Sequence, residues 1–410
     1  MSGFKIRDYQ DRISDEAAVI VANHGFVYLA MQVRTGKTFT SLAICDKLRA
    51  SNVLFLTKKK AIGSIESDYN TMQPKFKLTI INYESIHKLT DINYDYVVLD
   101  EAHRLSAFPK PGKTVKDVKK IVSKTRAKVI LMSGTPTPES FSQMYHQVYF
   151  IPGNPFSQYK NFYRFSDDHI EVTSKKIAGF DVRNYSNGKE SIMKAMEPYM
   201  ISYTQEEAGF TSKIEEFILY TEMSPVVKKI ISKLKRDKVV EGKDEVILGD
   251  TAVKLMNKVH QLCSGTIKFE SGNIAVLDTN KAEYIRDNFV GYKLGIFYKF
   301  QGELKAIKQV FGDNVTDSVE EFNETDKHIA LQILSGREGI SLAKADYLVY
   351  YNIDFSATSY WQSRDRMTTM DRPENTVYWI FVKGGLEQQV YNTVVKKRSF
   401  TTKHFNQDII

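Results

Sequence analysis

The stretch FVYLAMQVRTGKTFTSLAICDKLRA, residues 26–50, places an apolar run directly before a glycine turn and a helical pattern. The run is short and apolar at every position from Phe26 to Met31, which is typical of a strand buried on both faces. A strand that passes through a tight turn into a helix starts a crossover to the next parallel strand. The stretch therefore predicts an α/β fold.

Similar apolar runs recur along the chain and predict two parallel sheets flanked by helices. They are VLFLT (53–57), LTIINY (78–83), YVVLDE (96–101) and KVILMSG (128–134), then KLGIFY (293–298), HIALQIL (328–334), YLVYYNI (347–353) and NTVYWIFV (375–382). Between them, prolines, glycines and aromatics break the pattern from Ile151 onward. We expect a first lobe over 1–150, an irregular insert over 151–222, a helical connection over 223–290, and a second lobe with a C-terminal helix over 291–410.

Composition narrows the class of protein. The chain has 410 residues, 42% of them hydrophobic, and no apolar run approaches the roughly 18 residues that span a bilayer. Two cysteines without a CxxC pair argue against a disulfide framework or a structural metal. The start MSGFKIRDYQ is not typical of a signal peptide, so a cytoplasmic location is expected. The net charge of +8 favours a polyanionic partner.

The turn after the first run has the chemistry of a phosphate-binding loop. Gly36 lets the backbone approach a phosphate, Lys37 reaches the β- and γ-phosphates, and Thr38 offers a hydroxyl to Mg²⁺. Arg34 and Thr35 complete the predicted nucleotide contact. The usual consensus has a second glycine five residues before Gly36, where this chain has Met31, so the match is incomplete.

A second set of polar residues, Asp100, Glu101 and His103, ends the run YVVLDEAH. At the carboxyl end of a parallel strand, Asp100 can hold Mg²⁺ and Glu101 can activate a water molecule. His103 can couple this site to a neighbouring segment. The alternative is a plain helix start, which also favours acidic residues.

These motifs resemble superfamily two helicases and translocases. DEAH, residues 100–103, resembles the second motif of that family, and SGTP, residues 133–136, resembles its third. The segment RDYQ, residues 7–10, is similar to the one that reads adenine, which implies that Arg7 and Gln10 contact the base. The resemblance implies two RecA-like lobes that use ATP and Mg²⁺.

The second half is similar to the Swi/Snf-type branch of this superfamily, on the stretch LQILSGREGISLAKADYLVYYNIDFSATSYWQSRDRMTTMDR. The resemblance implies a glycine-rich turn over 335–339, with Gly339 near the nucleotide, and a helix that carries Gln362 and the arginine finger Arg366. The family places a second arginine three residues later, where this chain has Thr369. Arg364 and Arg372 are the alternatives for that second charge, and an exposed helix face remains open for both.

The resemblance also implies contacts to a nucleic-acid backbone. The candidates are Lys58, Lys59 and Tyr83 in the first lobe and Ser335 and Arg337 in the second. Two lysine-rich stretches, 116–128 and 228–243, can bind a duplex or can simply be solvated helix faces.

The preferred hypothesis is a DNA-dependent ATPase, a translocase or helicase on duplex or branched DNA without sequence preference. By analogy with compact phage motors we expect a role in phage recombination, repair or replication, in the host cytoplasm, and a monomer without membrane contact. One alternative is a DNA-binding scaffold with a degenerate ATPase site, motivated by Met31 and Thr369. Another is an ATP-driven subunit that acts on a protein partner.

Overall fold

The structure is a computed structural model. It describes residues 5–90, 93–177, 180–211, 213–336, 340–356, 359, 363–369, 372 and 374–395. The chain forms two compact units that meet in sequence between Gly209 and Phe210. Each unit contains a six-stranded sheet in which every paired neighbour is parallel. The predicted α/β fold with two lobes is therefore confirmed.

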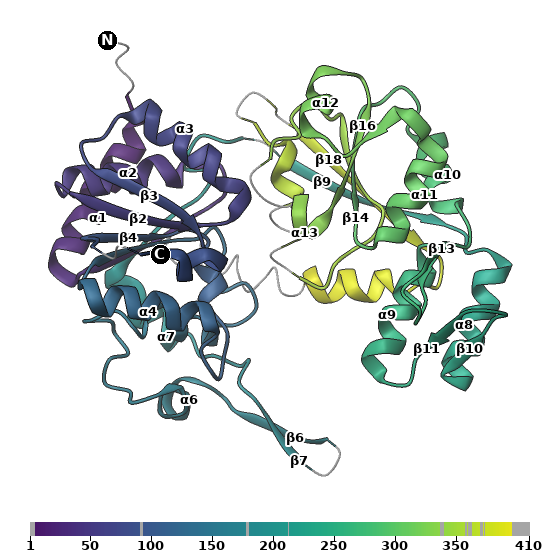
Figure 1. The fold of residues 1–410 in the computed structure, drawn as a ribbon, viewed down its shortest axis with the longest axis horizontal. Coiled ribbons are helices and arrows are strands. Elements are labelled where there is room, and N and C mark those ends of the chain that lie inside the picture. Colours follow the sequence, from purple (N-terminus) through teal and green to yellow (C-terminus); the bar gives the residue numbers. More distant parts are fainter. Residues whose placement is uncertain are drawn as a thin grey trace. The chain divides into compact units, whose positions relative to one another are not determined.

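The first sheet has the order β3-β2-β4-β5-β1-β8. Its strands are β1 (Phe26–Met31), β2 (Asn52–Thr57), β3 (Lys77–Asn82), β4 (Tyr96–Leu99), β5 (Lys128–Met132) and β8 (Met200–Tyr203). Its helices are α1 (Asp8–His24), α2 (Lys37–Lys47), α3 (Ile62–Met72), α4 (Lys113–Thr125), α5 (Tyr145–Val148), α6 (Phe162–His169) and α7 (Ser191–Met196). Figure 1 shows α1, α2 and α3 on one face of this sheet and α4 and α7 on the other.

Every residue of β1 is buried, as expected for a strand covered on both faces. Phe26, Tyr28 and Ala30 point to the face that packs against the apolar residues of α4 and α7. The opposite face of α4 is exposed and carries lysines (Lys113, Lys116, Lys119, Lys120 and Lys124). The lysine-rich stretch 116–128 thus forms mostly the solvated face of an amphipathic helix.

The second sheet has the order β15-β16-β14-β17-β18-β9. Its strands are β9 (Lys213–Thr221), β14 (Leu294–Tyr298), β15 (Val315–Thr316), β16 (His328–Gln332), β17 (Tyr347–Tyr350) and β18 (Glu374–Val382). Its helices are α8 (Pro225–Asp237), α9 (Ala252–Cys263), α10 (Asn280–Asn288), α11 (Gln301–Phe311), α12 (Val319–Glu324) and α13 (Ile333–Gly336). Two small hairpins, β10 (Val239–Glu241) with β11 (Val246–Leu248) and β12 (Thr266–Lys268) with β13 (Ile274–Val276), complete the unit.

The stretch 151–222, predicted as an irregular insert, is divided between the two units. Its first part carries α6, α7, β8 and a hairpin of β6 (Thr173–Ile177) and β7 (Phe180–Asn184). Phe156, Phe162 and Phe165 of this part are buried in the core of the first unit. Its last part forms β9, which pairs with β18 over nine residues. The aromatics that break the sequence pattern are thus core residues without a regular spacing.

Candidate active site

The candidate site lies along the carboxyl edge of the first sheet. Strands β1, β4 and β5 are neighbours and run parallel, so their last residues, Met31, Leu99 and Met132, lie at the same edge. The phosphate-loop candidate follows β1, the acidic pair follows β4, and SGTP follows β5. Three motifs that are far apart in sequence therefore meet at one place.

The loop between β1 and α2 requires glycine at residue 36. Gly36 has φ +78°, a conformation that residues with a side chain rarely adopt, and it is the N-cap of α2. A Cβ atom at this residue would lie 1.9 Å from Nε2 of Gln10. Met31, where the consensus has a glycine, is still the last residue of β1 and is fully buried. The strand runs straight into the loop there, so no glycine is needed.

Lys37 and Thr38 begin α2, whose free N–H groups face the loop. Nζ of Lys37 donates to the carbonyl oxygens of Met31 and Gln32, at 3.0 Å each. Thr38 is half-buried. The neighbouring Thr35 is fully buried, and its hydroxyl donates to the carbonyl of Gln32, so its side chain shapes the loop. Arg34 is half-buried with φ +64°.

The segment RDYQ lies against this loop. The hydroxyl of Tyr9 donates to the carbonyl of Thr35 at 3.1 Å, and Nε2 of Gln10 approaches the carbonyl of Gly36 at 3.4 Å. Oε1 of Gln10 accepts from the backbone N–H of Arg7, whose side chain is exposed. Gln10 therefore lies against the phosphate-loop candidate with Arg7 next to it, and the contact of both residues with a base stays a prediction.

Sequence reasoning missed Tyr203, the last residue of β8, and Gln205, which follows two residues later. The backbone N–H of Gln32 donates to the carbonyl of Tyr203, and the ring of Tyr203 stacks on Tyr9 with 4.9 Å between centroids. The side chain of Gln205 donates to the carbonyl of Val33 at 3.0 Å. These residues fix the loop from the side opposite β5. Their segment carries no recognisable motif, so only the pairing of β8 with β1 reveals them.

The acidic pair follows β4 directly. Oδ2 of Asp100 accepts from the hydroxyl of Thr57 at 2.7 Å. Burial, and next the charge of Glu101, raise the pKa of Asp100 to about 6. The Thr57 hydrogen bond and the nearby ammonium groups of Lys37 and Lys58 oppose that rise. A carboxylate in these surroundings would gain from a divalent cation.

Glu101 has φ +49°, a left-handed conformation that is uncommon for a residue with a side chain and is often found at functional sites. The conformation turns the chain sharply between β4 and the short 3₁₀ helix Ala102–Leu105. Nδ1 of His103 lies 3.2 Å from Oε2 of Glu101 and 2.9 Å from Oγ of Ser133. His103 thus couples the acidic pair to SGTP, as the sequence predicted.

SGTP also touches the end of β1. A Cβ atom on Gly134 would lie 3.3 Å from the backbone nitrogen of Val33 and 3.4 Å from the carbonyl oxygen of Met31. The backbone N–H of Ser133 donates to the carbonyl of Leu29. The SGTP segment therefore contacts both candidate motifs: Ser133 lies next to His103 of the acidic turn, and Gly134 lies against the start of the phosphate loop.

The residues fit a magnesium ion held by few protein ligands. The hydroxyl of Thr38 and the carboxylate of Asp100 are oxygen donors of the kind that Mg²⁺ prefers, and it usually keeps several waters. Among the described residues there is no group of three or more His, Cys, Asp or Glu side chains that could hold a metal alone.

Among the helices that the structure describes, none is long and apolar enough to cross a bilayer.

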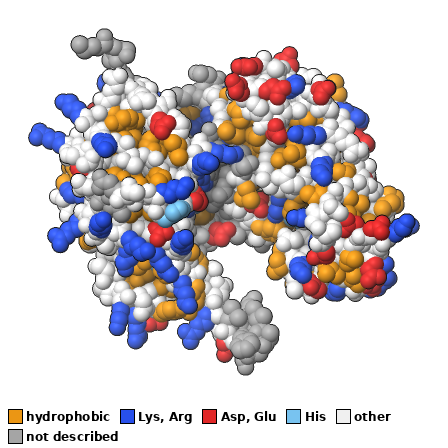
Figure 2. Space-filling view, in the orientation of Figure 1, with side chains coloured by type: hydrophobic (Ala, Val, Ile, Leu, Met, Phe, Trp, Pro, Cys, Tyr) orange, Lys and Arg blue, Asp and Glu red, His pale blue; other side chains and the backbone are white. Residues whose placement is uncertain are grey.

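The predicted nucleic-acid contacts of the first unit have different surroundings. Lys59 is exposed, whereas Lys58 is half-buried and its charge acts on Asp100. The prediction that Tyr83 contacts a nucleic acid must be corrected. Its side chain is only 3% exposed, and its hydroxyl donates to the carbonyl of Asp100 at 2.6 Å. It holds the acidic turn and is not available to a DNA backbone. Figure 2 shows Lys and Arg side chains gathered on the first unit where Figure 1 labels α4.

The three arginines of the second unit differ in their surroundings. Nη1 of Arg364 lies 2.7 Å from Oε1 of Glu216 on β9, and both side chains are nearly buried. The guanidinium of Arg372 donates to four carbonyls, those of Glu374, Ala343, Ala345 and Asp346. Both arginines thus hold their own unit together, which argues against Arg372 as the second catalytic charge.

Arg366 is half-buried, and its Nη1 donates to the carbonyl of Ile340 at 3.1 Å. It lies in a short 3₁₀ helix, Asp365–Met367, and a longer helix that also carries Gln362 stays a prediction. Gln362, Arg337 and Gly339 lie outside the described residues. Ser335 belongs to α13, directly after β16.

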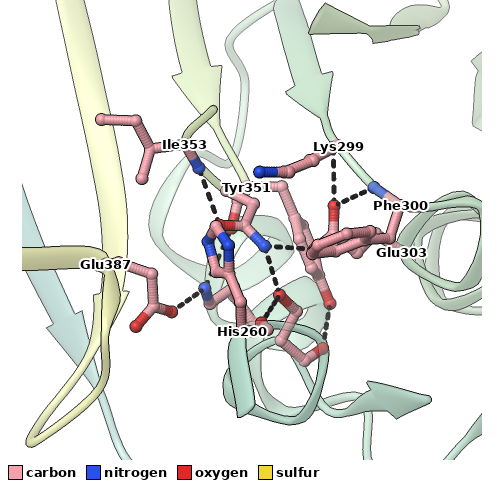
Figure 3. Close-up of polar contacts among 10 residues, drawn as sticks. His260, Lys299, Phe300, Glu303, Tyr351, Ile353 and Glu387 are labelled. Carbon is pink, nitrogen blue, oxygen red and sulfur yellow. Dashed lines mark hydrogen bonds and ion pairs between the residues drawn. The ribbon is translucent and has the colours of Figure 1, made fainter. Parts of the chain in front are cut away.

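A buried polar network fixes the end of β17 in the second unit (Figure 3). Asn352 is its centre: its side chain accepts from Nε2 of His260 at 2.6 Å and donates to Oε1 of Glu303 at 2.5 Å. The other oxygen of Glu303 accepts the backbone N–H groups of Lys299 and Phe300. Helices α9 and α11 are thereby tied to the two central strands.

An ion pair extends this network. Nζ of Lys281 on α10 donates to the carbonyl of Tyr351 and to Oε1 of Glu387, at 2.9 Å each, and both side chains are at most 2% exposed. Nearby, Nζ of Lys299 lies 3.1 Å from Oδ1 of Asp354. The segment that leads from β17 towards Arg366 therefore starts from a rigid point.

Comparison with known proteins assigns the chain to a family. The model of the SNF2-related domain matches residues 36–266, which is more than half of the chain. The chain therefore belongs to the SNF2-related family, the Swi/Snf-like branch that its motifs resemble.

Curated relatives are distant and much longer. The chain is 21% identical over 388 residues to the CHD3-type chromatin-remodeling factor PICKLE of Arabidopsis thaliana, covering 83% of this chain and 26% of the relative. It is 23% identical over 389 residues to chromodomain-helicase-DNA-binding protein 1 of Homo sapiens, covering 80% and 20%. A Sulfolobus solfataricus SWI2/SNF2 ATPase core in complex with dsDNA has a TM-score of 0.42 and 17% identity, covering 97% of this chain and 92% of that one.

We predict that His260 makes the second unit sensitive to mild acid. Burial, and next the charge of Lys299, lower the pKa of His260 to about 3 from an ordinary 6.5. The unfolded chain therefore binds a proton below pH 6.5 that the folded unit does not bind until about pH 3, so stability falls as the pH falls. Between pH 7 and pH 5 this group alone costs about 2 kcal/mol.

The measurement is urea unfolding at both pH values, followed by tryptophan fluorescence, since Trp361 and Trp379 both lie after Gly209 in the sequence. His260→Gln keeps a donor for Asn352 but removes the titrating group. Between pH 7 and pH 5 the variant should therefore lose about 2 kcal/mol less unfolding free energy than the wild type. His24→Gln, at an exposed histidine, is the control. Equal pH dependence in wild type and His260→Gln would contradict the assignment.

Proposed function

We propose that the chain is an ATP-dependent DNA translocase or helicase. The observation that carries this proposal is the meeting of Lys37, Asp100 and Glu101 at one edge of a parallel sheet, with Gly36 and Gln10 shaping the loop beside them. A cation, two carboxylates of which one has a raised pKa, and the N-terminus of α2 are the parts that phosphoryl transfer from a nucleotide needs.

Each residue has a proposed role. The N–H groups of the loop and Lys37 bind the β- and γ-phosphates, and Thr38 and Asp100 would hold Mg²⁺. Bound there, Mg²⁺ would neutralise charge on the phosphates. Glu101 orients and deprotonates the attacking water, and His103 keeps its carboxylate in place. Arg7 and Gln10 contact the base. Arg366, from the second unit, stabilises charge on the transferring group.

Two observations support DNA as the partner. The chain carries a net charge of +8. Several relatives are named chromodomain-helicase-DNA-binding or chromatin-remodeling proteins, although the chain spans only 20% to 35% of their length. We propose that Lys59, Ser335 and Arg337 contact the backbone of duplex or branched DNA. A setting in phage recombination, repair or replication stays a prediction.

The test of this function is ATP turnover measured with no DNA and with single-stranded, duplex and forked DNA, beside a strand-displacement assay. We expect duplex to raise turnover, with an affinity that falls steeply as salt rises. ATP turnover that stays at the background rate with every DNA would favour a DNA-binding scaffold without ATPase activity. Turnover that DNA leaves unchanged would favour an ATPase that acts on a protein partner.

Glu101→Gln should abolish ATP turnover, by at least about 10²–10⁴-fold, because it removes the base but keeps the shape of the side chain. DNA binding should remain, since Glu101 holds no DNA contact in this proposal. Turnover is followed by phosphate release and DNA binding by anisotropy. Glu66→Gln, at an exposed glutamate of α3, is the control. Full turnover in Glu101→Gln would refute the role.

Arg366→Ala should lose ATP turnover, whereas Arg372→Ala should lose stability. Arg366→Ala should lower the turnover number by on the order of 10³-fold or more, with the unfolding free energy nearly unchanged. Arg372→Ala leaves four carbonyls without their donor and should destabilise the second unit by roughly 1–3 kcal/mol. Turnover and urea unfolding of both variants separate the roles. The opposite pattern would make Arg372 the catalytic arginine.

A further inference from the structure

A groove of about 590 Å³ lies in the second unit, and its lining contains no residue of the phosphate-loop, DEAH or SGTP motifs. Helices α8 and α9, which lie side by side in Figure 1, form its walls together with the turn after β18. Its apolar lining is Met223, Ile231, Leu255, Met256, Val259 and Leu386. Nothing in the proposed nucleotide chemistry uses this groove.

Helix α9 presents a continuous apolar stripe to the groove, whereas α8 contributes Ile231 between polar residues. On α9 the lining residues are Ala252, Leu255, Met256 and Val259, the spacing of one helix face. The stripe runs on to Cys263 and is therefore about 16 Å long. Met256 is 37% exposed, and Val253, one turn before it, is 64% exposed. Exposed apolar surface on α9 thus includes Val253, which does not line the groove.

The rim of the groove is positively charged. On α8, Lys228 and Lys235 stand on either side of Ile231, and Lys383 lies in the turn after β18. No carboxylate is among the lining residues. Glu222 pairs with both Lys228 and Lys383, at 3.7 Å and 2.8 Å, which leaves an excess of positive charge. Lys235 is exposed and forms no ion pair among the described residues.

We propose that this groove binds an acidic amphipathic helix of a partner protein. An apolar stripe two to three turns long matches a helix whose apolar residues recur at i, i+3, i+4 and i+7. The lysine rim selects acidic residues on the flanks of that helix. This proposal does not depend on ATP hydrolysis, because the groove and the carboxyl edge of the first sheet share no residue.

Other occupants fit the groove less well. Nucleic acid would use the lysines but would leave the apolar floor without a partner. The chain's own C-terminal residues, KKRSFTTKHFNQDII, carry four Lys and Arg against one Asp and would be repelled by the rim. A small apolar ligand would leave Val253 and the lysines unused.

The test uses a fluorescent peptide of about four helical turns, with leucine at i, i+3, i+4 and i+7 and glutamate on the flanks. We expect saturable binding to the full chain by anisotropy, weaker binding of a scrambled peptide, and none of a peptide with lysine in place of glutamate. Lys235→Glu should weaken binding on the order of fivefold, and Lys233→Glu should not. Lys233 is also exposed on α8 but does not line the groove.

Met256→Glu should weaken peptide binding by more than about tenfold. Basal ATP turnover and the circular dichroism spectrum should stay unchanged in all variants. The absence of binding would overturn the proposal, as would equal losses in Lys233→Glu and Lys235→Glu. Loss of duplex DNA affinity in Lys235→Glu alone would make the groove a nucleic-acid site and overturn it as well. A dimer that Met256→Glu converts to a monomer would assign the groove to a second copy of the chain.

Discussion

The parallel direction of the first sheet is the constraint on which the rest depends. Because β1, β4 and β5 run the same way, one ammonium group and two carboxylates come to the same edge. Half-buried charges of this kind are costly unless they share a ligand. The apolar interior of the strands supplies the rigidity, and the polar residues beyond their ends supply the chemistry.

Several remote segments reach the loop between β1 and α2. Tyr9 and Gln10 contact it from α1, Tyr203 and Gln205 from the end of β8, and Gly134 from the end of β5. A phosphate that displaced Lys37 from the carbonyls of Met31 and Gln32 would change the contacts of all three. His103 and Ser133 would pass the same change to the acidic turn. If a nucleotide binds as we propose, this loop is where its presence would reach the other segments.

The fold could be predicted where the chemistry is local. Nine apolar runs became strands, and the motifs GKT, DEAH and SGTP follow strands as expected, because burial on both faces leaves a continuous apolar signature. Strands β8 and β9 escaped prediction since each is an edge strand with one neighbour, and every residue of β9 except Thr221 is exposed or half-buried. Their pairing is set by long-range contacts that no local pattern records.

The site was predictable only in part, for a related reason. A position after a strand indicates the edge on which a residue lies, but not the direction of its side chain. Tyr83 was expected to face a nucleic acid, yet its hydroxyl is used inside the acidic turn. Arg372 was expected to reach a phosphate, yet four carbonyls of its own unit hold it. Charge and position suggest a role, and only the partners in the fold decide it.

The most direct measurement of the central claim is an experimental structure of the chain with Mg²⁺ and a non-hydrolysable ATP analogue. We expect the phosphates over the backbone N–H groups of Gly36, Lys37 and Thr38. Nζ of Lys37 should have moved from Met31 and Gln32 to the phosphates, and the metal should lie on the Asp100 side of Thr38. A nucleotide bound elsewhere, or a Lys37 that keeps both carbonyls with the nucleotide present, would contradict the claim.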